Sequence, residues 1–446
     1  MKTLSFHLGR CWNMKWFKVA FIVLLLMVFA TTLLLGKEVV RIVFPGTSET
    51  EVQFSKELIA GIEQKYPNVK TEILYIGWGD LEKKLITMIM AGNVPDLVMQ
   101  QDYLTLAKMG ALEPLNSYLE KKPKNTVSKG VFINSLIEFS TYDGKIYTLP
   151  TVGISYGLLV RTDLLEEAGY QPSDIKTWDD LVKVAKELTV DKDGDGTIDQ
   201  YGIAYAAGAH RHAWRQAYIM GYSNNFSLDE AAQNKDKFIE VLELIKKLQP
   251  YMPTGTITMT LKEAFQSYAM GKAAMMITGS FFTGNVYPIN PEVIAKTRAI
   301  PFPKGPSAEN PWVPVANAGW AMFSKSKNKD IAWDVLTLIV SKEWGGLYSS
   351  FINIPARKDV SAEYVGSLAA EMYPLANAAK GNERIIDDFV EMTSLYGKPM
   401  KTIPGRVEME NVFTNYLSQL LEDKIDIETA YELITNGIEE IKAELE

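Results

Sequence analysis

The sequence predicts an α/β protein of two lobes that follows an N-terminal export segment. Three observations support this prediction. An apolar run extends from Val19 to Leu35, strand and helix patterns alternate from residue 38 onward, and most of the chain lies beyond the run. About 410 residues remain after the run, more than one compact core usually holds, and this length favours two lobes.

The N-terminal segment, residues 1–36, is predicted to be a signal peptide or an N-terminal membrane anchor. Lys15 and Lys18 precede the apolar run, as in the basic start of a secretory signal. A membrane-spanning helix needs about 20 apolar residues, and this run falls between the two classes. No small-residue cleavage motif stands before Lys37, and the only cysteine, Cys11, precedes the run, so no lipobox is visible. We expect an exported protein, periplasmic or at the cell surface, with cleavage favoured over anchoring.

Charge and cysteine content exclude further classes. The chain carries a formal net charge of −8. A nucleic-acid-binding protein would present a basic face, so no nucleic-acid partner is expected. Because the single cysteine lies in or before the export segment, the remaining chain has no disulfide and must be stabilised by packing.

The first part of the chain alternates strand and helix. We predict strands at Val39–Phe44, Val69–Ile76 and Leu97–Met99, and helices at Glu51–Tyr66 and Gly79–Met90. The first strand is almost continuously apolar, which is typical of a sheet covered on both faces. The order βαβαβ predicts a parallel or mostly parallel sheet.

Beyond a turn at Tyr142–Lys145, the patterns continue to mix the two kinds of element. The predicted strands are Ile146–Leu149, Gly157–Val160, Ala273–Thr278 and Trp320–Phe323, and the predicted helices are Thr162–Ala168, Thr177–Leu188, Lys262–Met270 and Asp330–Val340. From Ser361 the chain is predicted to be almost entirely helical. No repeat or low-complexity linker appears, so we expect the chain to cross between the lobes more than once.

Several short segments together resemble the extracellular solute-binding proteins of ATP-driven importers, the group that includes maltose-binding protein. The segments are Pro45–Glu49, Trp78–Leu85, Met90–Asp96, Asp143–Pro150, Asp163–Gly169, Thr177–Leu181, Gly271–Met276, Pro301–Lys304 and Ala332–Val335. Each is weak by itself, but their order and spacing are specific. They extend over nearly the whole chain beyond the export segment.

The resemblance implies a periplasmic-binding-protein-like fold, in which two α/β lobes are joined by hinge strands around a central cleft. The N-lobe would comprise residues 37–150 and 299–330, and the C-lobe residues 151–298 and 331–446. Hinge strands would lie near Tyr147–Tyr156 and near residues 299 and 324. Ligands of open α/β sheets bind beyond the carboxyl ends of the strands, which agrees with a cleft there.

Two departures from the resembled family fall near the expected ligand. Val160-Arg161 stands where the family usually has Tyr-Asn or Tyr-Asp, and Gly279-Ser-Phe281 stands where it often has Gly-x-Trp. The ligand is therefore expected to differ from that of typical members.

Polar residues at strand ends are the first candidates for ligand binding. Thr47, Ser48 and Glu49 follow the first strand, and Gln101 and Asp102 follow the third. Their side chains could pair sugar hydroxyls. The alternative is N-capping of the helices that follow. Because three strand ends meet at one edge of the sheet, we favour the ligand role.

Aromatic side chains are the second group, because sugars present flat apolar faces that suit aromatic platforms. The candidates are Trp78, Tyr156, Trp214, Phe281, Phe282, Trp312 and Trp320. Trp78 directly follows the second strand, and the resemblance places Trp320 near the hinge. For the four tryptophans, ordinary burial is an equally strong alternative. Trp178 and Trp333 are predicted to be structural.

Two arginines form a third group. Arg357 follows Asn353–Ala356 and Arg406 follows Ile403–Gly405, in loops that resemble the cleft-lining loops of the family. An arginine cluster would favour an anionic ligand such as a uronate or a phosphorylated sugar. For each arginine, a surface salt bridge is the favoured alternative.

The segment Asp191–Asp199 is the strongest local motif. Calcium loops carry oxygen ligands at fixed positions, with glycine at position 6. Here the candidate ligands are Asp191, Asp193, Asp195, Thr197 and Asp199, and Gly196 occupies position 6. Position 12 should be a bidentate Glu but is Gly202. A structural calcium ion is therefore one prediction, and a tight Asp-Gly turn without metal is the alternative.

The sequence as a whole predicts an exported substrate-binding protein that delivers a sugar or oligosaccharide to the permease of an ATP-driven (ABC) importer. It contains no serine-hydrolase, zinc-protease or nucleotide-binding motif, so no catalytic residue and no required cofactor are assigned. A monomer is expected. The alternatives are a binding protein for a non-sugar solute such as a glycerophosphodiester, and a secreted carbohydrate-active enzyme.

Overall fold

The computed structural model describes residues 37–445 except 47, 122, 126, 209, 353, 362–363, 365–382 and 402. The predicted export segment lies outside this part of the chain. Among the described residues, no helix combines the length and the apolar character needed to cross a bilayer.

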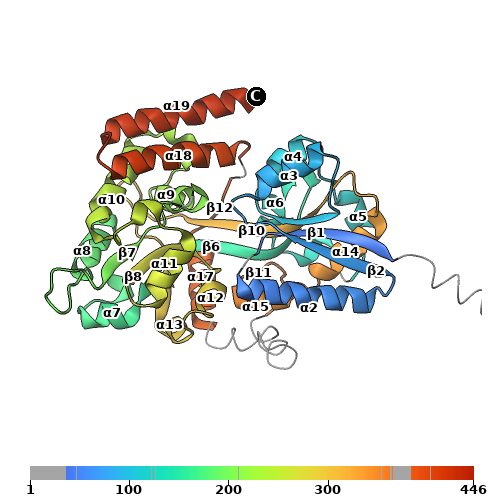
Figure 1. The fold of residues 1–446 in the computed structure, drawn as a ribbon, viewed down its shortest axis with the longest axis horizontal. Helices are drawn as coiled ribbons and strands as arrows, with labels where there is room; N and C mark the ends of the chain where they lie inside the picture. The colour runs from blue at the N-terminus through green and yellow to red at the C-terminus, as the bar shows by residue number, and fades with distance from the viewer. Residues whose placement is uncertain are drawn as a thin grey trace, which may run out of the picture.

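The first lobe begins with the predicted βαβαβ unit (Figure 1). Its elements are β1 (Glu38–Phe44), α2 (Glu49–Lys65), β2 (Val69–Tyr75), α3 (Leu81–Met90) and β3 (Leu97–Gln100). β1 pairs in parallel with β2 on one side and with β3 on the other. The predicted parallel sheet is therefore confirmed. Short elements follow: α4 (Leu104–Lys108), α5 (Asn116–Lys121), η1 (Lys129–Val131), α6 (Asn134–Phe139), β4 (Thr141–Tyr142) and β5 (Lys145–Ile146).

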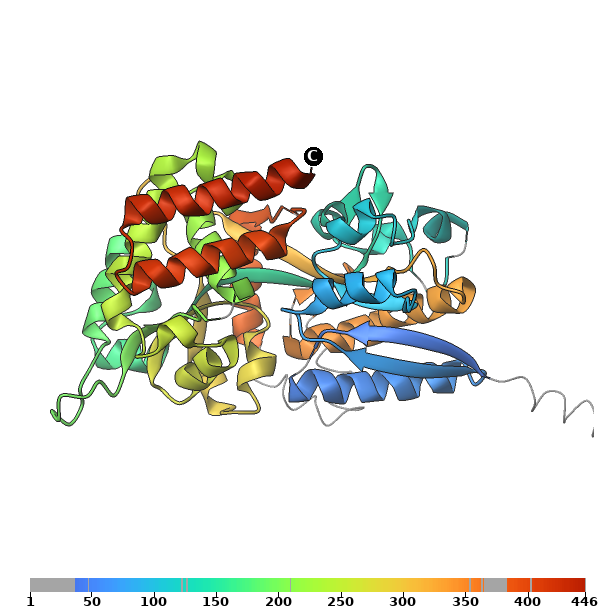
Figure 2. The ribbon, with the colours of Figure 1, turned by 45° about the horizontal axis from the view of Figure 1, so that its top comes forward.

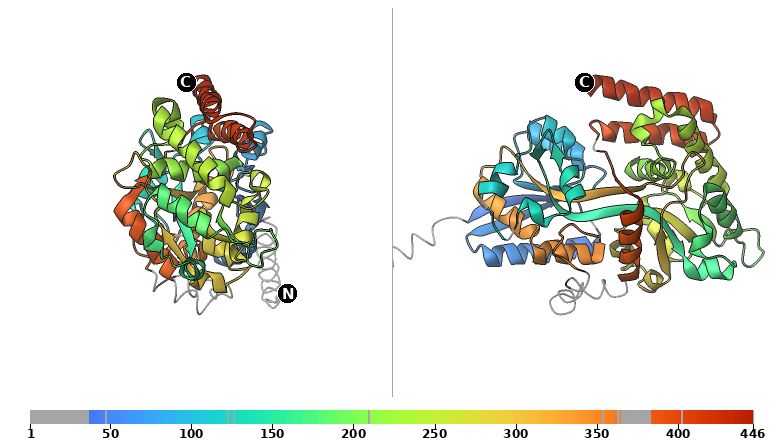
Figure 3. Two further views of the ribbon diagram at one scale, coloured as in Figure 1. Left: turned by 90° about the vertical axis from the view of Figure 1, so that its left-hand side faces the viewer. Right: turned by 180° about the vertical axis from the view of Figure 1, so that it is seen from behind.

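Two long strands run from one lobe into the other (Figures 1 and 3). β6 (Leu149–Arg161) is buried at all 13 of its positions. It pairs antiparallel with β10 (Val313–Met322), with an irregularity between Ala318 and Gly319. The sheet order β2-β1-β3-β10-β6-β8-β7 makes one continuous sheet through both lobes. The hinge strands expected near Tyr147–Tyr156 and near residue 324 thus correspond to β6 and β10.

β6 corrects one detail of the sequence prediction. The sequence predicts separate strands at Ile146–Leu149 and Gly157–Val160, but Leu149–Arg161 forms one strand. Pro150 suggested a break because proline cannot donate to a sheet ladder. It is accommodated here because it pairs with Gly319 at the irregular step of the ladder.

The second lobe carries the other half of the sheet and most of the helices (Figure 2). β8 (Ala273–Gly279) pairs antiparallel with β6 and in parallel with β7 (Tyr201–Ala204), and β9 (Thr297–Ile300) pairs antiparallel with β6. Its helices up to residue 295 are α7 (Thr162–Glu167), η2 (Pro172–Asp174), α8 (Trp178–Glu187), α9 (His210–Ser223), η3 (Leu228–Gln233), α10 (Lys235–Leu248), η4 (Gln249–Tyr251), η5 (Thr256–Thr258), α11 (Leu261–Ala269), α12 (Phe282–Val286) and α13 (Glu292–Ala295).

The C-terminal part is mainly helical, as predicted. Its described elements are α17 (Glu383–Tyr396), β12 (Gly397–Pro399), α18 (Arg406–Leu421) and α19 (Ile427–Leu445). α18 and α19 lie side by side on the second lobe (Figure 2), and β12 adds a short strand to β10.

The predicted lobe boundaries are wrong at two places. α14 (Lys329–Ile339) and α15 (Lys342–Ile352) pack on the first lobe, not the second, and β11 (Ile354–Pro355) pairs with residues 152–153 of β6. The Tyr66 hydroxyl donates to the Asp334 carbonyl at 3.3 Å, and the Trp344 ring lies 6.1 Å from that of Phe54. Conversely, β9 pairs with the second-lobe end of β6. Helix periodicity marks a buried face but does not say which lobe covers it.

Trp320, one of the predicted ligand-binding aromatics, belongs to the hydrophobic core. It is only 1% exposed, and its ring stacks on Phe44 with centroids 6.0 Å apart. Alternation along β10 turns this side chain toward the packed face of the sheet. Its assignment to the cleft is therefore wrong.

We expect Trp320→Ala to lower the free energy of unfolding by about 3–5 kcal/mol, because truncating a fully buried aromatic side chain leaves a cavity. Trp320→Phe, which keeps most of the volume, should cost clearly less. Urea denaturation of both variants measures this difference. Equal stability of Trp320→Ala and the parent chain would contradict the core assignment.

Candidate functional site

A cavity of about 560 Å³ lies between the two lobes. The first lobe and the crossing strands contribute Ser48, Glu49, Glu51, Trp78, Gly79, Gln101, Val152, Ile154, Ala318 and Tyr348. The second lobe contributes Tyr156, Arg211, His212, Arg215, Leu261, Lys262, Phe265, Phe281, Gly284, Asn285, Pro288 and Ile289. Of the predicted ligand-binding residues, Ser48, Glu49, Trp78, Gln101, Tyr156 and Phe281 are in this set.

The first-lobe residues are positioned by the carboxyl ends of three parallel strands. Ser48 follows β1, Trp78 follows β2 and Gln101 follows β3. Ser48 also caps α2, because its hydroxyl oxygen accepts from the Glu51 amide at 3.3 Å and the Ser48 amide donates to the Glu51 carboxylate at 3.2 Å. Capping and cavity lining thus coexist at this residue. Thr47 lies outside the described residues.

An aromatic corner forms the opposite wall. Tyr156 comes from β6, Phe281 follows β8 and Phe265 comes from α11. The Phe281 ring meets Tyr156 edge-on with centroids 6.2 Å apart, and meets Phe265 edge-on at 6.3 Å. Edge-to-face packing of this kind holds the rings in fixed orientations. The cavity therefore combines rigid apolar surfaces with a few polar groups, as ligand sites usually do.

Ionic contacts join the two lobes beside the cavity. The Arg211 guanidinium of α9 donates to the Asp102 carboxylate at 2.8 Å and to the Gln101 side-chain oxygen at 2.5 Å. Arg406, at the start of α18, also contacts Asp102. Burial alone would raise the pKa of Asp102, but Arg406, Arg211 and Arg215 outweigh it and lower the pKa to about 2. Asp102 is therefore ionised at neutral pH and holds two second-lobe arginines.

A second contact between the lobes lies at α2. The Thr50 hydroxyl donates to the Gly284 carbonyl of α12 at 3.3 Å. Gly284 lines the cavity, so the lobes also meet along this border. The structure thus has the lobes in contact at two separate places around the cavity.

Several predicted site residues lie elsewhere. Asp102 and Arg406 bond to each other in the lobe interface, and Asp102 lines a small adjoining pocket. Arg357 is 3% exposed, pairs with Asp359 at 2.8 Å and is not among the residues that line the cavity. The expectation of a surface salt bridge is also wrong for both arginines, because both are buried.

Three aromatic assignments to the cleft are likewise wrong. Trp214 and Phe282 are fully buried, Trp214 against Phe413 and Phe282 against Tyr268. Trp312 is half-buried and packs edge-on against Tyr222 at 5.9 Å. Phe281 and Phe282 show why the sequence alone does not identify the cavity-lining aromatics. They are adjacent in the chain, but only Phe281 lines the cavity.

The residues that the sequence did not reveal come mainly from helices. Arg211 and Arg215 lie one turn apart on α9, and Leu261 and Phe265 lie one turn apart on α11. Residues four apart share a helix face, so each pair presents one face to the cavity. The one sequence signal for the α9 residues is the run of basic residues His210, Arg211, His212 and Arg215 around Trp214.

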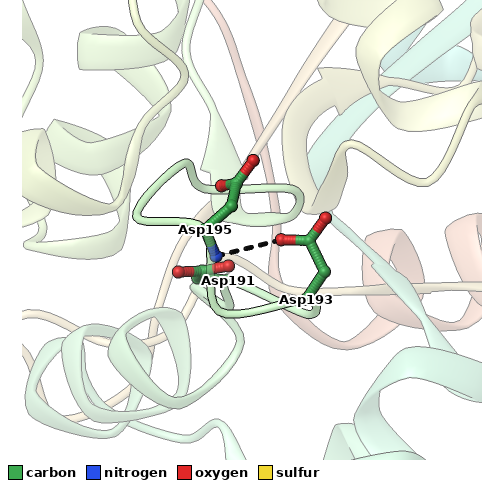
Figure 4. A group of neighbouring side chains, drawn as sticks. All are labelled: Asp191, Asp193 and Asp195. Atoms are coloured by element: carbon green, nitrogen blue, oxygen red, sulfur yellow. Dashed lines mark hydrogen bonds between the residues drawn. The ribbon is translucent and has the colours of Figure 1, made fainter.

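The predicted calcium loop has its carboxylates close together (Figure 4). Asp191, Asp193 and Asp195 each offer an oxygen, and these oxygens lie within 4.8 Å of one another. The Asp191 carboxylate already accepts from the Gly194 and Gly196 amides, each at 2.8 Å. The other two predicted ligands, Asp199 and Thr197, make different contacts. Asp199 accepts from the Lys192 amide, while Thr197 uses its own amide to reach Asp195.

Comparison with known proteins decides the family. A family model described as bacterial extracellular solute-binding protein matches residues 46–346. The chain belongs to this family. The family resemblance predicted from short segments is therefore confirmed.

Relatives and solved structures agree with this assignment. The lactose-binding protein of Rhizobium radiobacter is 24% identical over 313 residues, which make up 66% of this chain and 68% of that protein. The arabinooligosaccharide-binding protein of Bacillus subtilis is 22% identical over 325 residues, or 69% of this chain and 71% of that protein. An ABC substrate-binding protein of Listeria monocytogenes, solved in complex with cycloalternan, superposes with a TM-score of 0.74 at 18% identity. The match covers 92% of this chain and 99% of that structure, and it confirms the predicted two-lobed α/β fold.

His212 gives the solute-binding protein a predictable pH dependence. Burial, together with Arg211 and Arg215, lowers its pKa to about 3. An unfolded histidine has a pKa of about 6.5, so below that pH the unfolded chain binds a proton that the folded chain does not. We expect the free energy of unfolding to fall by up to about 1.4 kcal/mol per pH unit as the pH drops from about 6.5 toward about 3.

Urea denaturation between about pH 7 and about pH 5 measures this effect. His212→Asn should remove the histidine part of the slope, whereas His210→Gln, on the same helix, should retain it. A slope unchanged by His212→Asn would show that His212 does not titrate differently in the two states.

Proposed function

We propose that this chain binds a sugar or oligosaccharide in the interlobe cavity and presents it unchanged to the permease of an ABC importer. The observation that supports the proposal is the cavity itself, which is lined by aromatic rings and polar side chains from both lobes. Its volume of about 560 Å³ lies within the usual range for small-molecule sites, roughly 300–1,000 Å³.

The named ligands of related proteins support a sugar over other solutes. Lactose and arabinooligosaccharide appear in the names of two relatives. Cycloalternan and mannobiose are bound in two structural neighbours. These names do not favour the glycerophosphodiester alternative.

The mechanism we propose is closure of the lobes over the ligand. β6 and β10 connect the lobes, while Asp102–Arg211 and Thr50–Gly284 are contacts that exist only when the lobes meet. A ligand that touches both walls binds the closed arrangement better than the open one and shifts the population toward it. The permease would then distinguish loaded from empty protein by its shape.

The arrangement of carboxylates supports binding without turnover. Glycoside hydrolysis generally uses two carboxyl groups that flank the bond to be cleaved. The cavity-lining carboxylates of the described chain, Glu49 and Glu51, lie two residues apart on the first turn of α2. Such positions do not face each other on a helix, and Glu51 is bonded to Ser48 and Tyr348.

Location and assembly complete the proposal. We propose that residues 1–36 export the chain, and that it then acts outside the cytoplasm as a monomer, either released or held at the membrane by that segment.

We further propose calcium as a structural ion of the loop formed by Asp191, Asp193 and Asp195. The close approach of their oxygens supports it, because oxygen ligands in this spacing suit calcium. Adding calcium chloride should raise the melting temperature, since an ion that binds only the folded state stabilises it. Magnesium chloride at the same ionic strength is the control, and Asp193→Asn should abolish the rise. An unchanged melting temperature with calcium would favour the alternative, a tight Asp-Gly turn without metal.

The sugar proposal is tested by thermal shift with a panel of neutral mono- and oligosaccharides, followed by calorimetry on each hit. Ligand binding to the folded state raises the melting temperature. Trp78→Ala should weaken binding by about 2 kcal/mol, or roughly thirtyfold, as for a buried aromatic anchor. Trp312→Ala, outside the cavity, should leave the affinity unchanged.

Chemical analysis of each recovered sugar separates binder from enzyme. We expect the sugar to return intact. Cleaved sugar in every positive case would replace the transport proposal with a hydrolase. Equal affinity loss in Trp78→Ala and Trp312→Ala would show that the cavity is not the site.

A further inference from the structure

The charged residues of the cavity lie on three helices, with Lys262 alone on α11. Arg211 and Arg215 contact Trp78, Gln101 and Tyr156, and they lie four residues apart on α9. Glu49 and Glu51 belong to α2 instead. Two guanidinium groups on one helix face repel each other unless anions compensate them. The carboxylates near Arg211 and Arg215 therefore decide whether their positive charges are compensated.

The carboxylates near these arginines are already engaged. Asp102 accepts from Arg211 and contacts Arg406. Glu410 lies 3.0 Å from Arg406, measured between Oε1 and Nε. Burial raises the pKa of the nearby Glu82 to about 7, so at neutral pH this group carries only part of a charge. These contacts account for Arg211 and Arg406 but not for Arg215.

Arg215 is buried next to the cavity with neutral partners. It is 4% exposed and lines the cavity wall. Its Nη1 lies 3.1 Å from the Tyr156 hydroxyl and 3.0 Å from the Met400 sulfur, and its Nη2 lies 3.3 Å from the Gln101 side-chain oxygen. Within the described part of the chain, no carboxylate forms an ion pair with it. The Asp102 carboxylate attracts Arg215 without forming an ion pair with it. A buried charge without a directly bonded counter-charge is unfavourable, so a ligand anion would be stabilised here.

The arginines also lie beside the rings on which a sugar would stack. The guanidinium carbon of Arg215 is 5.0 Å from the centre of the Tyr156 ring, and that of Arg211 is 5.5 Å from the centre of the Trp78 ring. A sugar packed against either ring would bring its substituents next to a guanidinium. The planar fork of arginine matches a carboxylate or a phosphate with two parallel hydrogen bonds.

We propose that the cavity selects a sugar that carries an anionic group, and that Arg215, assisted by Arg211, binds this group. The inference rests on the proposed function, because it assigns a ligand class to the same cavity. The anion, a uronate carboxylate or a phosphate ester, would give Arg215 a direct ion-pair partner, whereas Asp102 is already bonded to Arg211 and Arg406.

Matched ligand pairs test the inference on the unmodified chain. Oligosaccharides of galacturonate, mannuronate and glucuronate are each compared with their methyl esters, which keep the sugar and remove the charge. Glucose 6-phosphate and glucose form the phosphate pair, so the two sources of anion are distinguished. By calorimetry we expect the acid of at least one pair to bind at least about tenfold more tightly than its neutral partner.

Substitutions then assign the preference to Arg215. Arg215→Gln should reduce the ratio of acid to neutral affinity by about tenfold. Arg215→Lys keeps the positive charge and should therefore retain part of the ratio of acid to neutral affinity. It serves as the second variant if Arg215→Gln folds poorly. Arg41→Gln removes a positive charge from a side chain that is 59% exposed on β1, and it should leave the ratio unchanged.

Each outcome bears on one statement. Neutral sugars that bind as tightly as every acid would overturn the inference and leave the proposed sugar transport intact. A preference for the acid that survives Arg215→Gln would overturn the role of Arg215. Failure of all neutral and acidic sugars to bind would overturn the inference together with the proposed function.

Discussion

The antiparallel pairing of β6 with β10 is the constraint on which the rest of the structure depends. These two strands belong to both lobes, so a single sheet runs from β2 to β7 without an edge between the halves. The ligand-facing strand ends of the first lobe and the aromatic corner of the second are therefore held in register. Relative motion of the lobes must be absorbed along these strands, because a continuous hydrogen-bonded ladder resists any other displacement.

The two walls of the cavity differ in character. Apolar rings from the second lobe give a fixed surface, and the first lobe contributes polar side chains at its strand ends. The Asp102 carboxylate joins the lobes through Arg211 and Arg406 and does not line the cavity. In the proposed mechanism, closure and ligand recognition therefore use adjacent but different residues.

Burial determines how each polar group behaves. Asp102 stays ionised because guanidinium groups surround it, whereas His212 is kept neutral by burial and by two arginines. Arg215 is buried as deeply and lacks a carboxylate partner within the described chain. Burial therefore opposes all three charges. The neighbouring guanidinium groups overcome this effect at Asp102 and add to it at His212 and Arg215.

The sequence by itself determined the fold class, the family and the edge of the sheet at which the cavity lies. Strand ends follow directly from apolar runs and turn residues, so Ser48, Trp78 and Gln101 could be placed before the structure was known. Only the tertiary structure decided which aromatics reach the cavity, that α14 and α15 return to the first lobe, and that Arg211 and Arg215 line it. The physical reason is that periodicity shows that a side chain is buried but not against what, and burial in a core and burial beside a ligand leave the same pattern in the sequence.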